Sequence, residues 1–366
     1  MSTAAETKPK RTIIPFGPQH PVLPEPIHLD LVLEDEKVVE VIPSIGFIHR
    51  GLEKLVEIKD FQEMTYVAER ICGICSCIHG HSYCEAIENI MNIIVPERAK
   101  YLRVFWDELS RIHSHILWAG LFADSFGFES LFMHSWRIRE RIIDIVEETT
   151  GGRVIFGYCK IGGTRRDIAN DRLKSVVTEL KAIEKECHSI TEVFAKDYSV
   201  KKRTKGIGML SKDDAVKLGA VGPMMRASGI ASDARKLGYA AYGNLKWEPI
   251  TESGCDCHAR LMVRCREIYQ AFDLAYQAAD KMPDGPIETK VTGNPTGEFA
   301  ARLEQPRGEV IYYVKGNGTK NLARFRVRTP TFANIPPLLK ALEGCELPDV
   351  PVIVLTIDPC ISCAER

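Results

Sequence analysis

Four of the twelve cysteines in this 366-residue sequence form two C-x-x-C pairs, and these pairs have the clearest capacity for chemistry. One pair is Cys72 and Cys75, and the other is Cys360 and Cys363. Two residues between the cysteines let both thiolates reach one metal ion, and Gly73 permits the tight backbone that this needs. In a chain without a secretory signal, such pairs indicate metal binding or redox chemistry rather than structural disulfides.

The spacing between the two pairs differs from that of a local zinc motif. A zinc ribbon brings its pairs together over roughly 15–20 residues, whereas Cys75 and Cys360 lie near opposite ends of this sequence. The whole fold must bring the second pair to the first, which a structural zinc does not need and a buried reaction centre could use. Four thiolates suit zinc, a single iron, an iron–sulfur cluster or nickel, and the spacing alone does not choose among them.

The elements expected to position these pairs are mainly helical. Alternating apolar residues over 27–33, a charged turn and an apolar run over 38–42 predict a β-hairpin. Helical periodicity begins at residue 51 and runs toward residue 70, just before the first pair. Further helices are expected at residues 79–94, 97–123, 129–148, 167–197, 211–219 and 259–282. Together they predict a helical bundle at the centre of the protein.

The C-terminal part has a different pattern, with short strands expected at residues 310–314, 325–328 and 352–357 among loops. The predicted fold class is therefore α+β. It combines a central bundle of long helices with an N-terminal β-hairpin or sheet and a small mixed C-terminal part.

No internal repeat or low-complexity linker divides the sequence. Residues 1–12 are expected to form a flexible tail, and residues 13–366 a single domain. That domain has three regions: β-rich 13–50, helical 51–200 and mixed 201–366 with the C-terminal metal-binding segment.

The composition excludes several classes of protein. Hydrophobic residues make up 45%, charged residues 27%, and the net charge is −1, which indicates a folded chain with a large core. The near-neutral charge argues against a nucleic-acid binder, which would carry a basic stripe. No run of about 18 apolar residues is present, so no membrane-spanning segment is expected. The polar start lacks an apolar region, so export by a cleaved signal peptide is not expected.

The motifs around the cysteines resemble those of a known family. R-x-C-G-x-C-x-x-x-H at residues 70–79 and D-P-C-x-x-C-x-x-R at residues 358–366 resemble the paired signatures of the nickel–iron hydrogenase large subunit. Further stretches resemble its energy-converting (Ech-type) branch, and equally the quinone-site subunit of respiratory complex I: residues 16–21, 49–51 and 222–236. The resemblance extends over residues 14–366. Because the complex I subunit lacks the four thiolates, the hydrogenase is favoured and the quinone-binding subunit is the alternative.

The resemblance implies a metal centre and a reaction. Cys72, Cys75, Cys360 and Cys363 would bind nickel, and Cys75 and Cys363 would also bridge to an iron that carries carbon monoxide and cyanide ligands. The reaction would be the reversible formation and oxidation of hydrogen, in which H2 splits heterolytically and a nearby base takes the proton. Cys360 is the expected base. The alternative from the residues alone is a scaffold whose cysteines hold one structural zinc.

Two loops match those that surround the iron ligands in this family. Arg307, in Pro306-Arg307-Gly308, would place a fixed cation beside the open site, and Thr331 would donate its hydroxyl to a cyanide nitrogen. His79 could donate a hydrogen bond to a bridging sulfur, although a lone histidine is also common as a structural residue.

A proton must also leave a dry site. Glu25, held between two prolines, matches an acidic position that the Ech-like branch uses as the first relay. His20 is a further candidate on that route, while Glu53 and Glu69 are competing carboxylates beside the helices that carry the first pair. Many relatives end in a histidine that helps to bind magnesium, whereas Arg366 cannot ligate a cation, so no such magnesium is expected.

The remaining cysteines match no family ligand: residues 77, 84, 159, 187, 255, 257, 265 and 345. Cys255-Asp256-Cys257-His258 could form a second metal site, but buried or half-exposed free thiols are the simpler interpretation. No iron–sulfur cluster is expected in this chain, so electrons would pass through an iron–sulfur small subunit to ferredoxin. The resemblance also implies integral membrane subunits that translocate ions, and a peripheral position on the cytoplasmic side of the cell membrane.

Overall fold

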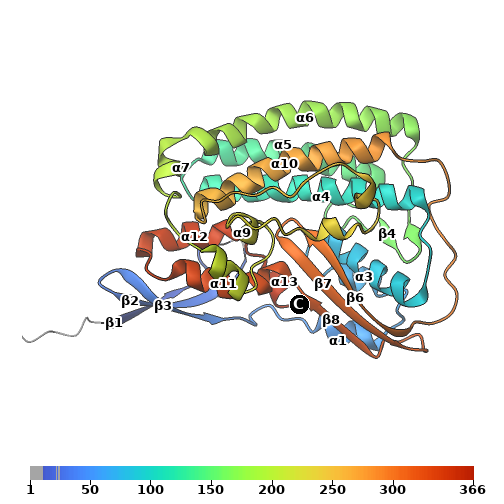
Figure 1. Cartoon of the computed structure of the whole chain (residues 1–366), viewed down its shortest axis with the longest axis horizontal. Helices are drawn as coiled ribbons and strands as arrows, with labels where there is room; N and C mark the ends of the chain where they lie inside the picture. Colours follow the sequence, from blue (N-terminus) through green and yellow to red (C-terminus); the bar gives the residue numbers. More distant parts are fainter. Residues whose placement is uncertain (1–10, 22, 24) are drawn as a thin grey trace, which may run out of the picture.

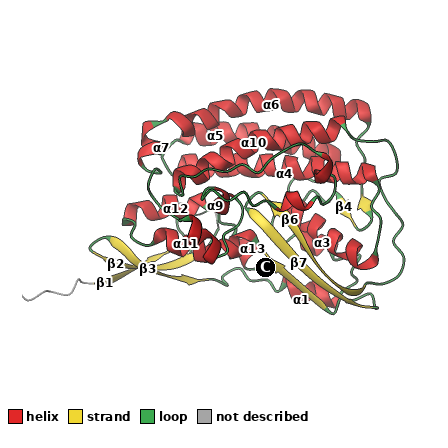
Figure 2. Cartoon of the chain, in the orientation of Figure 1, coloured by secondary structure: helices red, strands yellow, loops and turns green. Residues whose placement is uncertain are grey.

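The computed structural model describes residues 11–21, 23 and 25–366, and its centre is a layer of long helices (Figures 1 and 2). These helices are α4 (Glu97–Asp124), α5 (Glu129–Thr150), α6 (Asn170–Lys196) and α10 (Cys257–Asp280). Helix α4 packs between α5 and α10, and α6 packs against both of these. Because α4 is in the middle, nearly all of its side chains are buried, including charged ones. The predicted helical bundle and the α+β fold class are confirmed.

An antiparallel sheet of β1 (Arg11–Phe16), β2 (His28–Glu34) and β3 (Lys37–Ser44) contains the predicted hairpin. The alternating residues Leu29, Leu31 and Leu33 are buried on one face, as the sequence pattern predicts. Residues 1–10 of the expected tail lie outside the described residues, whereas Arg11 and Thr12 begin β1.

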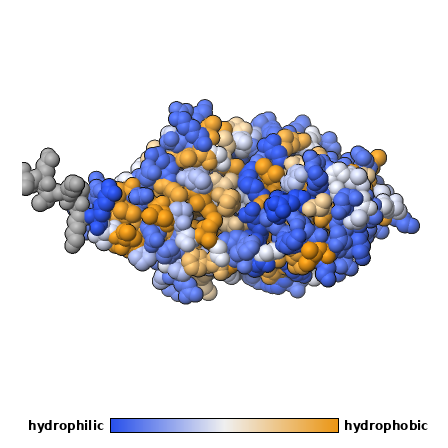
Figure 3. Space-filling view, turned by 90° about the horizontal axis from the view of Figure 1, so that it is seen from below, coloured by the Kyte–Doolittle hydropathy of each residue, from blue (hydrophilic) through white to orange (hydrophobic). Residues whose placement is uncertain are grey.

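The other face of this sheet and the loop that follows it expose apolar side chains, among them Ile13, Ile42, Ile45 and Phe47. Figure 3 shows hydrophobic surface gathered at the end of the molecule that carries the sheet. Exposed apolar patches of this kind mark surfaces that contact other proteins.

A second antiparallel sheet lies at the opposite end and consists of β6 (Thr296–Gln305), β7 (Gly308–Asn317) and β8 (Arg324–Arg328). Helix α3 (Ser76–Met91) packs on it. Strands β7 and β8 cover the strands predicted for this region, whereas β6 was not predicted. The tight turn between β6 and β7 contains Pro306 and Arg307, so the sheet fixes the position of both residues.

Residues 352–357 were predicted to form a strand, and this prediction is wrong because residues 352–356 lie in α12 (Val350–Thr356) and Ile357 is its C-cap. Val352, Ile353, Val354 and Leu355 are all buried, so the run has no polar face that could reveal a helical period. Pro351 lies in the first turn, where proline favours the start of a helix.

The shorter elements complete the chain. They are α1 (Leu52–Ile58), α2 (Thr65–Glu69), β4 (Cys159–Lys160), β5 (Gly163–Thr164), α7 (Tyr198–Lys202), α8 (Lys212–Lys217), α9 (Pro223–Arg226), η1 (Ala234–Leu237), η2 (Tyr242–Asn244), α11 (Pro330–Leu342), η3 (Leu347–Asp349) and α13 (Ile361–Ala364). Among the described residues, no helix combines the length and apolar character needed to cross a membrane.

A buried ionic cluster joins the helical layer to the second sheet. Arg226 donates to Glu267 at 2.8 Å and to Glu304 at 2.7 Å. Next to it, Arg235 donates to Asp233 at 2.7 Å. Since a buried charge is tolerated only with a partner, each member fixes the position of its neighbours. The cluster explains why charged residues recur in the 222–236 stretch.

Helix α3, which begins at the first cysteine pair, is tied to α4 by another buried ion pair. The two terminal nitrogens of Arg103 donate to the two carboxylate oxygens of Glu88 at 2.9 and 2.6 Å. Glu88 also accepts a hydrogen bond from the backbone of Gly162 at 2.7 Å. This bidentate pair therefore fixes α3 against both α4 and the β4–β5 hairpin.

Glu88→Gln is expected to lower the free energy of unfolding by about 3–5 kcal/mol, because it leaves the Arg103 charge buried and uncompensated. Urea denaturation at pH 7 measures the change. Glu97→Gln is the matched control, because the Glu97–Lys100 pair is largely exposed and its loss is expected to cost less than about 1 kcal/mol. Equal losses in the two variants would contradict the structural role of the buried pair.

Candidate metal centre

The four paired cysteines converge in the protein interior. The sulfur of Cys72 lies 3.2 Å from that of Cys360, and the sulfur of Cys75 lies 3.4 Å from that of Cys363. The sulfurs of Cys72, Cys75 and Cys363 all lie within 4.8 Å of one another. All four side chains are buried. The fold thus brings the two distant pairs to one point, as the sequence analysis expected.

Each pair is held by a short connection between helices. The first lies between α2 and α3, with Cys75 as the residue that precedes α3. The second lies between α12 and α13, after Asp358, whose φ of 56° is in the left-handed region that non-glycine residues seldom adopt. This turn directs the chain from the end of α12 back toward the first pair.

Arg50 joins the backbones of the two cysteine segments. One terminal nitrogen donates to the carbonyls of Ile71 at 2.8 Å and Ser362 at 3.1 Å, and the other donates to the carbonyl of Arg70 at 3.1 Å. The planar guanidinium fork can reach all three acceptors at once. Sequence reasoning noticed Arg50 only as part of a family-like stretch, because its backbone acceptors leave no pattern in the sequence.

Arg307 is the cation of the site. Its Nε donates to the carbonyl of Asp358 and its Nη2 to the carboxylate of the same residue, both at 2.8 Å. Burial opposes the charge, but Asp358 and the nearby thiolates outweigh it and raise the pKa of Arg307 well above its ordinary value. Gly222 lies against the Arg307 turn, where a Cβ would be 2.4 Å from the Arg307 carbonyl oxygen, so only glycine fits.

His79 lies between one of the cysteines and a buried tyrosine. Its Nε2 is 3.2 Å from the Cys363 sulfur and also 3.2 Å from the Gln305 side-chain nitrogen, and its Nδ1 is 2.5 Å from the Tyr312 hydroxyl. Burial is the main cause that raises the pKa of Tyr312, so its hydroxyl keeps its proton and can donate to Nδ1. The Cys363 sulfur and the Gln305 amide nitrogen thus both face Nε2 of this ring.

Two threonines support the second pair. The Thr331 hydroxyl oxygen accepts from the backbone N–H of Cys360 at 3.1 Å, and the Thr329 hydroxyl donates to the carbonyl of Cys363 at 3.0 Å. The Thr331 hydroxyl therefore keeps its own proton for donation to another group. Pro306 is buried in the β6–β7 turn beside Arg307.

Glu25 is placed at the second cysteine pair. Its carboxylate accepts hydrogen bonds from the backbone N–H groups of Ile361 and Ser362, and from the Ser362 hydroxyl at 2.9 Å. It therefore holds the residues between Cys360 and Cys363 in place. The ring of His20, the other residue suggested for this route, packs on Phe16.

The two competing carboxylates differ in their surroundings. Glu53 accepts from Arg366 at 3.0 Å and from the backbone of Val327 at 2.8 Å. Glu69 is buried, and its Oε2 has no hydrogen-bond partner among the described residues.

His113 is a positioning residue that the sequence analysis missed. Its Nδ1 accepts a hydrogen bond from Arg139 at 3.3 Å, so its Nε2–H donates to the carbonyl of Ile74, between the first two cysteines, at 3.0 Å. Burial and the Arg139 charge lower the pKa of His113 to about 3. The ring is therefore neutral at physiological pH and acts as a fixed donor.

The 255–258 segment does not gather around one point. The Cys257 sulfur accepts from Arg260 at 3.1 Å, whereas Asp256 accepts from the backbone of Ala259 at 2.7 Å and starts α10. Of the cysteines outside the two pairs, Cys255 and Cys345 are half-exposed and the rest are buried, as expected for free thiols.

Comparison with known proteins identifies the family. Residues 125–294 and 289–366 match the family described as "Respiratory-chain NADH dehydrogenase, 49 Kd subunit". Residues 50–120, which include the first cysteine pair, match "Nickel-dependent hydrogenase". The chain belongs to the family that nickel–iron hydrogenases share with the 49 kDa subunit of complex I.

Individual relatives agree over nearly the whole chain. The membrane-bound hydrogenase subunit alpha of Pyrococcus furiosus is 38% identical over 96% of this chain and 87% of the relative. The carbon monoxide-induced hydrogenase of Rhodospirillum rubrum is 39% identical over 96% of this chain and 99% of the relative. A chain in the structure of an archaeal respiratory complex, the membrane-bound sulfane sulfur reductase, superposes with a TM-score of 0.92 at 29% identity and 100% coverage of both chains. The family resemblance seen in the sequence is thus confirmed.

The residues present fit the metal that this family implies. All four converging donors are sulfur, which suits soft transition metals, and they are buried in a place that Arg307 supplies with a compensating positive charge. The Nε2 of His79, the donor N–H of His113 and the hydroxyl of Thr331 surround the cluster with the outer hydrogen bonds that metal sites need.

Arg50→Lys is expected to loosen the C-terminal segment, because a lysine cannot reach three carbonyls at once. Loss of such charged hydrogen bonds costs about 1.5–3 kcal/mol, which corresponds to roughly tenfold to hundredfold faster local opening. Amide hydrogen exchange of residues 358–366, followed by mass spectrometry, measures it. Arg70→Lys is the control, since the Arg70 side chain donates to the carbonyl of Tyr66, four residues earlier, at 2.9 Å. Unchanged exchange in Arg50→Lys would show that the clamp is dispensable.

Proposed function

We propose that this chain is the catalytic large subunit of an energy-converting nickel–iron hydrogenase, which forms and oxidises hydrogen. The observation that carries the proposal is the convergence of Cys72, Cys75, Cys360 and Cys363, from opposite ends of the sequence, at one buried point. These thiolates would hold nickel, and Cys75 and Cys363 would also hold an iron with carbon monoxide and cyanide ligands. When bound, this pair of metals supplies the position at which H2 is bound and polarised.

The protein's own groups would then manage charge and protons. The Cys360 thiolate is the nearest base for the proton released from H2, and Arg307, fixed by Asp358, would hold a positive charge beside it. Thr331 keeps a hydroxyl proton that could be donated to a cyanide nitrogen, and His79 presents Nε2 to Cys363, which would also hold the iron. Each contact supports the role that the family resemblance suggests.

Glu25 is the proposed first proton relay. Its contact with the N–H groups of Ile361 and Ser362 places a carboxylate within one residue of Cys360, where a proton could be passed onward. This proximity supports the relay proposal, and the same hydrogen bonds support the fold of the segment.

The proposed partners follow from the relatives. These are named as subunits of membrane-bound hydrogenases and of formate hydrogenlyase, and the similar structure belongs to a respiratory membrane complex. We infer that this chain is a peripheral subunit on the cytoplasmic side of the membrane. It would pass electrons through an iron–sulfur small subunit to ferredoxin, and would adjoin integral membrane subunits that move ions. The exposed apolar face of the β1–β3 sheet offers one surface for such contacts.

A second candidate is a quinone-binding subunit like that of complex I, which the match to the 49 kDa family over residues 125–366 favours. The four converging thiols argue against it, because a quinone site has no need of them. Competitive inhibition of the purified complex by a quinone analogue would support this alternative.

Cys360→Ser, in a complex that still assembles, is expected to reduce hydrogen evolution by at least about 100-fold, because the expected base and metal ligand is replaced. Cys345→Ser, which changes a half-exposed cysteine outside the two pairs, is the control and should keep full activity. Hydrogen evolution from a reduced dye, measured with a hydrogen electrode, checks both variants. Full activity in assembled Cys360→Ser would refute the proposed centre.

A further inference from the structure

The Glu69 carboxyl is a buried acidic group for which the proposed mechanism has no role. It lies in α2, three residues before Cys72, and is 2% exposed. One carboxyl oxygen, Oε2, has no hydrogen-bond partner among the described residues. An unpartnered buried oxygen is costly, so a position of this kind needs an explanation in terms of function.

The carboxyl is fitted against the helix that begins at the first cysteine pair. A Cβ added at Gly80 of α3 would lie 2.7 Å from Cγ and 2.8 Å from Oε1 of Glu69, and one at Gly157 would lie 3.7 Å from Oε2. Gly80 thus makes room for this side chain, whereas a Cβ at Gly157 would be at ordinary contact distance. Its negative charge also contributes, after burial and Asp107, to raising the pKa of Cys77.

A solvent-accessible cavity of about 770 Å³ is lined by Arg165, whose positive charge acts on the Glu69 carboxyl. Its lining includes Tyr66, which precedes Glu69 by three residues in α2 and lies on the same face of that helix. Tyr66 is exposed, whereas Glu69, three residues later in α2, is buried.

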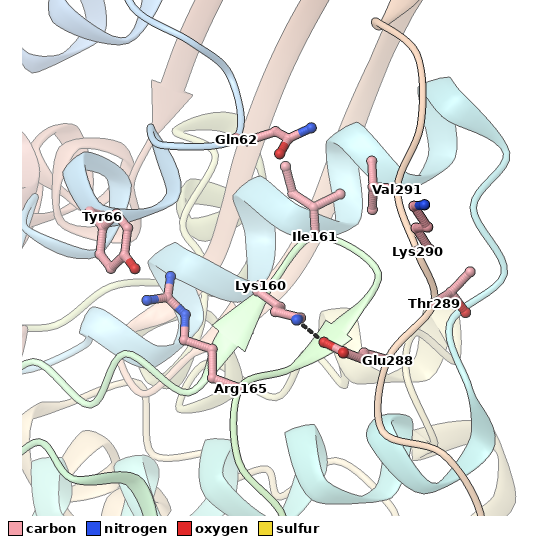
Figure 4. Close-up of a pocket in the computed structure, with 9 residues that line it drawn as sticks. All are labelled: Gln62, Tyr66, Lys160, Ile161, Arg165, Glu288, Thr289, Lys290 and Val291. Atoms are coloured by element: carbon pink, nitrogen blue, oxygen red, sulfur yellow. Dashed lines mark ion pairs between the residues drawn. The ribbon is translucent and has the colours of Figure 1, made fainter.

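Arg165 connects the cavity to Glu69. Its guanidinium lies 4.0 Å from the centre of the Tyr66 ring and is anchored by a hydrogen bond from Nε to the Cys159 carbonyl at 3.2 Å. Figure 4 shows Tyr66 and Arg165 near each other, with the Lys160–Glu288 ion pair further along the cavity. The positive charges of Arg165 and Lys160 can orient water there.

The acidity of Glu69 suits proton transfer at neutral pH. Burial raises its pKa to about 7, against the opposing effects of Arg165 and Arg70. A carboxyl with this pKa both takes up and releases protons readily near pH 7.

We propose that Glu69 is a second proton-relay residue, which passes protons between the thiol side of the metal centre and water in the cavity lined by Tyr66, Lys160 and Arg165. The inference rests on the proposed hydrogenase function. Oxidation of one H2 yields two protons and two electrons; the electrons leave through the partner subunit. A proton leaving the centre binds the Glu69 carboxylate, and its release to cavity water restores the carboxylate.

Unlike Glu69, Glu25 has both oxygens occupied by hydrogen-bond donors.

Exchange of deuterium gas with water protons tests the relay in the assembled complex, because exchange needs proton transfer but no electron acceptor. Glu69→Gln is expected to keep its nickel and lose at least about tenfold in exchange rate, with a larger solvent isotope effect. Glu63→Gln, which changes an exposed carboxyl six residues earlier, should match the wild type. If nickel-loaded Glu69→Gln exchanges deuterium at the wild-type rate, the relay is overturned and the proposed function stands. If the wild-type complex contains no nickel and shows no exchange, the proposed function is overturned, and the relay with it.

Thermal stability gives a readout that does not depend on turnover. The pKa of Glu69 is raised to about 7 by folding, so stability from its neutral form is lost as pH rises toward and through 7. The melting temperature of Glu69→Gln should therefore nearly equal that of the wild type at pH 5 and exceed it at pH 8, whereas Glu63→Gln should show no such pH-dependent gap. A constant gap for Glu69→Gln from pH 5 to pH 8 would overturn the assignment.

Discussion

Four cysteine thiols from opposite ends of the chain must meet where water does not reach, and the rest of the structure depends on that requirement. The sulfurs of Cys72 and Cys360 lie 3.2 Å apart and those of Cys75 and Cys363 lie 3.4 Å apart, so as thiolates they would repel one another and lack hydration. Positive charge and hydrogen-bond donors in the surrounding protein compensate for this loss. Arg307 supplies the charge, and the backbone N–H of Ile74, which donates to the Cys72 sulfur at 3.3 Å, supplies one of the donors.

The C-terminal segment has little structure of its own, since α13 is only four residues long. Its position therefore comes from side chains of distant elements: Arg50 holds its backbone, Glu25 accepts its N–H groups, and Arg307 binds Asp358 before it. These anchors belong to the N-terminal region and to the β6–β7 turn. The long helices and the buried ionic cluster hold those regions in fixed relative positions, so that the two cysteine pairs can meet.

The features that leave a periodic or local pattern in the sequence could be predicted from it. Long amphipathic helices, the alternating hairpin and the spacing of the cysteines all leave periodic or local patterns, and the structure contains them. The run at residues 352–357 was mistaken for a strand because a fully buried helix and a fully buried strand have the same apolar pattern. Arg50, Asp358 and His113 could not be assigned from sequence, because their partners are backbone atoms or residues far away in the chain.

The identity of the metal tests the central claim most directly. The measurement is the amount of nickel, iron and zinc per chain in the purified complex by elemental analysis. The account predicts about one nickel per chain, together with iron, since four buried thiolates beside a fixed cation are proposed to hold that pair. Zinc in a stoichiometric amount without nickel, in a fully assembled and matured complex, would contradict it and would identify the cysteines as a structural site.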